Sequence, residues 1–134
     1  MIAVYLEATV EEQETYYSPE RVIALLRLYP YLLDSRPPKD PELGRLAKAT
    51  FGPSGWREEA AAKRADIWNA IKQLEQRDWR AAYCVRAYYA VGLSLTATAS
   101  YLARQCGREY HHSTIRELMD AGIDWMARDL GWKG

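Results

Sequence analysis

Cysteine is scarce in this chain of 134 residues, and no segment has the character of a leader or a membrane anchor. The two cysteines, Cys84 and Cys106, are too few for a disulfide framework, and we expect both to be reduced thiols. Residues 1–10 lack the basic start of a signal peptide and carry Glu7 within their apolar stretch. No run reaches the roughly 18 apolar residues that a membrane span needs. We therefore expect a cytoplasmic protein with no membrane partner.

Proline is absent after residue 53, although six prolines lie at or before that position. This asymmetry predicts a chain of two parts. Residues 1–55 would form an N-terminal arm and a short helix with a proline-rich linker, and residues 56–134 would form a helical domain. The pattern of residues 1–10 fits either a strand or a poorly ordered arm.

Helix and turn signals alternate in the first part of the chain. Ser18 followed by Pro19 is typical of an N-cap and the first helical position. The apolar residues that follow predict a short helix ending at Pro30. The prolines of residues 35–41 predict a turn or linker, and the glycines of residues 52–55 predict a second break.

Helical periodicity begins at Trp56 and continues along the second part of the chain. Apolar residues recur on one helical face at Ala60, Ile67, Ile71 and Leu74. Asp78 is a suitable N-cap for a helix over residues 79–91, which Gly92 would end. That helix is apolar on nearly all sides, so we expect it at the centre of the core. The predicted fold class is all-α, a helical bundle.

The formal net charge is zero, but the charges are unevenly distributed along the chain. Residues 79–116 contain one acid, Glu109, and their positively charged residues are all arginines, which gives a net charge of +4: Arg80, Arg86, Arg104, Arg108 and Arg116. The planar guanidinium group of arginine suits phosphate oxygens and guanine edges. This stretch is therefore the candidate nucleic-acid surface.

The end of this stretch predicts two helices joined by a turn. Ser94 can cap a helix in which Leu95, Ala99 and Leu102 share a face, and Ala99 supplies the small residue that a helix-turn-helix crossing requires. After Gly107, the pattern predicts a long helix. The residues on its core-facing side would be Ile115, Met119, Gly122 and Met126, with Leu118 and Trp125 beside them. A recognition helix reads base edges from its exposed N-terminal end. The predicted DNA-contacting residues are Arg104, Arg108, His111, His112, Ser113, Thr114, Arg116 and Glu117.

The stretch 85–94, together with Ala99 and residues 113–115, resembles the helix-turn-helix of sigma-70 region 4. The segment between Leu102 and Ile115 is longer than the turn of that family. Either the first helix extends past Arg104, or the turn is an enlarged, winged loop.

The whole chain is similar in layout to phage late-transcription regulators of the RinA/ArpU kind. These regulators combine a Tyr-Pro step, here Tyr29 and Pro30, with a C-terminal sigma-like helix-turn-helix, here at about residues 94–130. The resemblance implies a phage-derived regulator in a bacterial host cell. It also implies binding to double-stranded DNA near a promoter and contact with host RNA polymerase.

Signals for metal binding and catalysis are weak. Cys106, His111 and His112 lie close in sequence, but a structural zinc site needs four ligands and the chain offers no second Cys/His pair. The aspartates of residues 120–129 recur at helical spacing, which is typical of a solvated helix face. We expect no metal, no cofactor and no enzymatic activity.

Two other functions stay open at this point. The first is a phage DNA-packaging subunit of the small-terminase kind, in which a helix-turn-helix and a long helix also occur together. The second is a protein-interaction module whose end at Trp125, Leu130 and Trp132 packs on a partner. A ring of many subunits would favour packaging, whereas a monomer or homodimer on a discrete promoter fragment would favour regulation.

Overall fold

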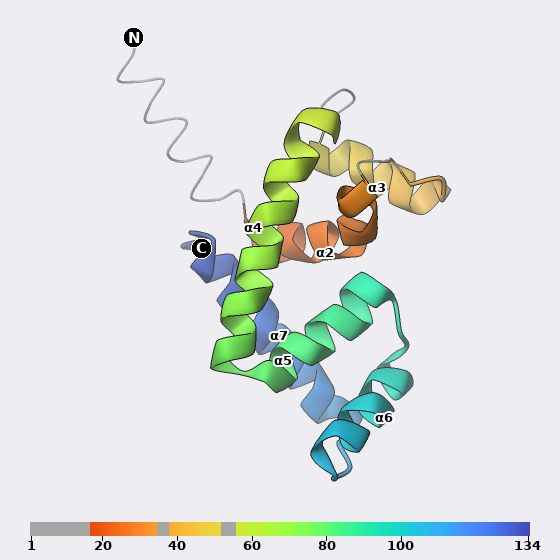
Figure 1. Ribbon diagram of the computed structural model, residues 1–134, viewed down its shortest axis with the longest axis vertical. Helices are drawn as coiled ribbons and strands as arrows, with labels where there is room; N and C mark the ends of the chain where they lie inside the picture. Colours follow the sequence, from red (N-terminus) through yellow and green to blue (C-terminus); the bar gives the residue numbers. More distant parts are fainter. Residues whose placement is uncertain (1–16, 35–37, 52–55) are drawn as a thin grey trace.

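The computed structural model describes residues 17–34, 38–51 and 56–134, and every regular element within these ranges is a helix (Figure 1). In chain order the elements are α2 (Pro19–Asp34), α3 (Pro41–Phe51), α4 (Trp56–Arg77), α5 (Trp79–Val85), the π-helix η1 (Arg86–Val91), α6 (Leu95–Cys106) and α7 (His112–Asp129). The all-α prediction is confirmed for these ranges. The predictions for residues 1–10 and 52–55 lie outside the described residues. Among the described helices, none combines the length and the apolarity that crossing a bilayer requires.

Short polar side chains begin three helices where the sequence predicts them. The Ser94 side chain accepts a hydrogen bond from the Ala97 backbone N–H at 3.0 Å. Ser18 and Asp78 cap α2 and α5 in the same way. Gly92 ends η1 with a φ of 86°, a left-handed conformation that glycine adopts without steric cost. These boundaries follow from local hydrogen bonding, which is why the sequence indicates them correctly.

The prediction that the first helix ends at Pro30 is wrong, because α2 continues through this proline to Asp34. A proline inside a helix removes one backbone N–H and costs about 3 kcal/mol. Leu32 lies beyond the proline and is fully buried. Burial of a leucine side chain contributes roughly 1.5–3 kcal/mol. Packing of the last turn of α2 into the core therefore offsets most of the lost helical bonding.

A second helix, α3, begins inside the region that the sequence predicts to be a linker. Its first residue is Pro41, and the Asp40 carboxylate accepts a hydrogen bond from the Glu42 backbone N–H at 2.8 Å. This is the same arrangement of a capping residue and a proline that begins α2. Ala47 and Phe51 bury the inner face of α3. The capping signal was present in the sequence, but the neighbouring prolines obscured it.

One hydrophobic cluster joins helices from both sides of residue 55. α2 packs against α4, η1 and α7, while α5 packs against α4 and α7. The largest fully buried side chains come from most of these helices: Leu25, Leu26, Leu28, Leu32, Ile67, Ile71, Leu74, Leu102, Ile115 and Met126. α6 and the beginning of α7 form the end of the molecule away from α3 (Figure 1).

The helix predicted over residues 79–91 forms as α5 and η1, but the core does not enclose it on all sides. Cys84 and Val85 are fully buried, and burial raises the pKa of the Cys84 thiol to about 11. By contrast, Trp79 is 49% exposed and Val91 is 70% exposed. The helix therefore packs in the core through its middle, as expected, whereas its two ends are exposed. An apolar composition does not reveal how many neighbours a helix has, and here the neighbouring helices leave both ends open.

α7 lies close to α5 and α4 at Gly122. A Cβ atom placed at Gly122 would lie 3.0 Å from Cγ2 of Val85 and 3.2 Å from Cδ2 of Leu74. Ile115, Met119, Gly122 and Met126 are all buried, so the predicted inner face of α7 is confirmed. The small residue at position 122 sets the separation of these helices.

We expect Gly122→Val to destabilise the fold by about 1–3 kcal/mol, because the added methyl groups cannot be accommodated between α7 and α5. Ala121→Val is the matched control, since Ala121 is exposed on the same helix. This change should cost only the difference in helix propensity between alanine and valine, which is below about 0.7 kcal/mol. Urea unfolding of both variants measures the two effects. Equal destabilisation would contradict a tight crossing at Gly122.

Candidate nucleic-acid interface

α6 and α7 are joined by a connection over residues 107–111. α6 continues past Arg104 to Cys106, and Gly107 ends it in a left-handed conformation with a φ of 68°. Of the two explanations for the long segment after Leu102, the extended first helix is therefore correct. The residues facing inward from α6 are Thr98, Ala99 and Leu102, all buried. Ala99 is only 7% exposed, as expected for a small residue where α6 meets its neighbours.

The predicted DNA-contacting residues gather at the end of α6, in the connection and in the first turns of α7. All but one of them are exposed: Arg104, Arg108, His111, His112, Ser113, Arg116 and Glu117. Thr114 is half-buried beside the fully buried Ile115. His111 occupies the N-cap position of α7, and its side chain makes no capping hydrogen bond there.

The arginines of the basic stretch fall into two groups according to their partners. Arg86 pairs with Glu75 of α4 at 3.1 Å, and Arg80 lies 3.7 Å from the Asp78 carboxylate. Hydrogen bonding to Tyr110 and the charge of Asp78 raise the pKa of Arg80 above its usual value. These two arginines therefore already have a negative or polar partner within the protein.

The second group consists of Arg104, Arg108 and Arg116, which form no ion pair with any residue that the structure describes. The guanidinium group of Arg104 lies over the Tyr101 ring at 5.5 Å, and that of Arg108 lies over the Tyr110 ring at 4.7 Å. An aromatic face attracts a guanidinium group without neutralising its charge. These three arginines thus keep a full positive charge available to an anion.

Tyr101 and Tyr110 belong to this surface but are not among the residues predicted to contact DNA. Tyr101 is 44% exposed and Tyr110 is half-buried. The spacing of Tyr101 three residues before Arg104 on one helix was the available signal, since such residues are neighbours on a helix surface. Both rings restrict where the adjacent guanidinium groups can point.

Two acids lie among the exposed residues and lower the charge of this surface. Glu109 and Glu117 are both exposed, so Arg104, Arg108 and Arg116 leave a net charge of +1. The surface is therefore only weakly basic. Selective contacts rather than bulk charge would have to supply most of any affinity.

The other candidate sites have a plain structural description. Within the described ranges, no three His, Cys, Asp or Glu side chains are grouped to hold a metal ion. Trp125, Leu130 and Trp132 are half-buried and pack against the chain's own core. Arg128 also lies over the Trp132 ring at 5.0 Å. The C-terminal aromatic end is thus largely covered by the protein itself.

No family model, curated protein or solved structure matches this chain. The resemblance to sigma-70 region 4 and to the RinA/ArpU regulators stays a prediction carried by the residues quoted for it.

We expect Ala99→Leu to lower the stability of the fold by about 1–3 kcal/mol, because α6 contacts both α5 and α7 and leaves no room for three more carbons. At about 4 °C per kcal/mol, the melting temperature should fall measurably. Ser100→Leu serves as the control, since Ser100 is exposed on the same helix. An unchanged melting temperature for Ala99→Leu would show that position 99 is not at the crossing.

Proposed function

We propose that this chain is a sequence-dependent DNA-binding transcription regulator that contacts double-stranded DNA through the end of α6 and the beginning of α7. The observation that carries this proposal is the group of exposed arginines without ion pairs: Arg104, Arg108 and Arg116. RNA polymerase, which the sigma-like resemblance implies, is the proposed protein partner near a promoter.

The arrangement of α7 supports binding through its N-terminal end. The backbone N–H groups of the first turn of a helix carry partial positive charge, which favours a nearby phosphate. Ser113 is exposed in that turn, and Arg116 is exposed one turn into the helix. A side chain at this position can reach base edges in a major groove while the helix N-terminus faces the backbone.

The two arginines on α5 and η1 have a different role in this proposal. Arg86 is held by Glu75, and Arg80 is held near Asp78 and Tyr110. If either guanidinium group moved to a phosphate, its carboxylate partner would be left unpaired. The net gain in binding free energy would therefore be small. They serve as matched controls for the arginines of the proposed interface.

The rival functions make different demands on the molecule. An interaction module acting through Trp125, Leu130 and Trp132 would need those side chains free, but each is half-buried against the core. A packaging subunit would need a ring of many copies. Sedimentation of the purified chain distinguishes a ring from the monomer or homodimer expected of a regulator.

Binding to random-sequence duplex DNA should depend on salt through a small number of phosphates. If the three arginines without ion pairs neutralise about three phosphates, log K should fall with log salt at a slope of about −2.7. A titration between low and moderate salt measures this slope by fluorescence anisotropy. A slope near zero would contradict DNA binding by this surface, and a much steeper one would mean that further residues take part.

Replacing Arg116 by alanine should separate sequence recognition from general adhesion. On a duplex selected from a random library by the protein itself, Arg116→Ala should lose about 1–3 kcal/mol of binding free energy, because a bidentate contact to guanine is lost. On a scrambled duplex the loss should be much smaller. Arg86→Ala is the matched control and should change both affinities little, since its side chain is engaged with Glu75.

Competition binding with the selected and scrambled duplexes measures, for each variant, the ratio of its affinity to that of the unmodified chain on each duplex. A parallel loss on the two duplexes would mean that Arg116 contacts phosphate, and recognition would then lie with His111 or His112. An equal effect of Arg86→Ala would contradict the division of the arginines into two groups.

A further inference from the structure

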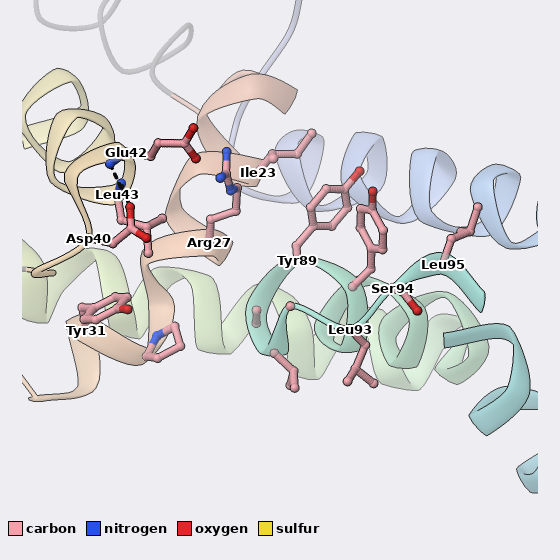
Figure 2. Close-up of a pocket in the computed structure, with 15 residues that line it drawn as sticks. Ile23, Arg27, Tyr31, Asp40, Glu42, Leu43, Tyr89, Leu93, Ser94 and Leu95 are labelled. Atoms are coloured by element: carbon pink, nitrogen blue, oxygen red, sulfur yellow. Dashed lines mark hydrogen bonds between the residues drawn. The ribbon is translucent and has the colours of Figure 1, made fainter. Parts of the chain in front are cut away.

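A groove of about 860 Å³ separates the N-terminal helices from the start of α6. α2 and the beginning of α3 line one side, and the last residues of η1 with residues 92–95 line the other. Figure 2 shows Arg27 and Glu42 projecting from α2 and α3 into the space that Tyr89 borders from η1. The groove lies at the opposite end of α6 from Arg104, so the proposed DNA interface does not include it.

Aromatic side chains contribute to the groove surface. Tyr31, Tyr88 and Tyr89 all line it, and the rings of Tyr88 and Tyr89 meet edge to face with their centroids 5.0 Å apart. Tyr88 is 37% exposed and Val91 is 70% exposed, although large apolar side chains are usually covered. Exposed aromatic faces are favourable surfaces for a cation or for the side chain of a peptide.

The π-helix, whose residues 88–91 line the groove, ends in carbonyl groups that have no partner within the helix. The N–H groups of Gly92 and Leu93 both donate to the Ala87 carbonyl. The carbonyl groups of residues 88–91 accept no hydrogen bond from any described residue. The C-terminal end of a helix carries partial negative charge for this reason. An extended polypeptide has free backbone N–H groups that can donate to such carbonyls, whereas a helix has used its own.

Charged side chains make the groove mildly negative. Asp40 and Glu42 line it, and Arg27 is the single cation among its described lining residues. One Asp40 oxygen caps α3, whereas the exposed Glu42 forms no ion pair within the described ranges. The N-terminus of α6 at the groove is likewise already capped, by Ser94. Carboxylates and carbonyls repel phosphate, so a nucleic acid is disfavoured here.

We propose that this groove docks an extended segment of a partner protein that carries a lysine or an arginine. The cation lies against the exposed ring of Tyr88, Glu42 contributes a negative charge from the facing wall of the groove, and the segment's N–H groups donate to the carbonyls of η1. Charge complementarity selects this occupant over an acidic peptide, and the need for free backbone N–H groups selects an extended segment over a helix. Binding of the segment connects α2 and α3 to the beginning of α6.

Selection from a displayed library of random peptides, with the whole chain as bait, tests the proposal. The enriched peptides should be rich in lysine or arginine. A fluorescein-labelled copy of the most enriched peptide then measures affinity by anisotropy. Glu42→Gln should weaken binding about threefold, the effect expected of one exposed charge pair. Glu59→Gln is the matched control, because Glu59 is exposed on α4 and does not line the groove.

Tyr88→Leu removes the aromatic face but keeps apolar bulk, and it should also weaken binding by about twofold to fivefold. Circular dichroism of each variant checks that the fold is intact. Enrichment of acidic or uncharged peptides, failure to enrich any peptide, or equal effects of Glu42→Gln and Glu59→Gln would overturn the proposal. Dimerisation in sedimentation that Glu42→Gln abolishes would also overturn it, because a second copy of the chain would then be the occupant.

Discussion

The close contact of α7 with α5 at Gly122 is the constraint on which the arrangement of the other helices depends. Val85 and Leu74 occupy the space that a side chain at position 122 would fill, so α4, α5 and α7 meet at one point. α2 then packs against α4, η1 and α7 and completes the core. α7 is held there by its middle, and in its first turns Ile115 stays in the core while the polar residues beside it are exposed.

The electrostatics of the proposed interface follow from this arrangement. The packing of α5 against α4 brings Arg86 within 3.1 Å of Glu75 and removes one arginine from the available positive charge. At the end of α6, no described acid forms an ion pair with Arg104 or Arg108, and these two arginines rest on tyrosine rings instead. A basic stretch that looks uniform in sequence is thus divided by tertiary structure into paired and available arginines. Only the available group is suited to bind an anion.

The helix of residues 79–91 connects the two proposed binding regions. Its first half is held in the core by Cys84 and Val85, and its second half widens into the π-helix η1. A π-helical segment has poorer hydrogen bonding than an α-helix and is frequent at functional sites. Here it places Tyr88, Tyr89 and unused carbonyl groups along the groove. The segment is therefore buried in its first half, and its second half lines the groove.

The sequence by itself determined the features that depend on neighbouring residues. Ser18, Asp78 and Ser94 cap helices and Gly92 ends one, because each acts on backbone groups within a few positions of itself. The inner face of α7 was predictable for a similar reason, since helical periodicity alone decides which residues share a face. The exposure of Arg104, Arg116 and Glu117 followed from the same periodicity, since these residues lie on the outer faces of α6 and α7.

Only the tertiary structure decided the features that need a distant neighbour. α2 continues past Pro30 because the Leu32 side chain is buried in a core that later helices mainly build. Arg86 is not available to an anion because it pairs with Glu75, which lies eleven residues earlier on another helix. The groove forms only where α2, α3 and η1 meet, so the sequence of any one of these segments could not predict it. Local hydrogen bonds and periodicity are encoded within a few residues, whereas burial and charge pairing depend on which segments meet in space.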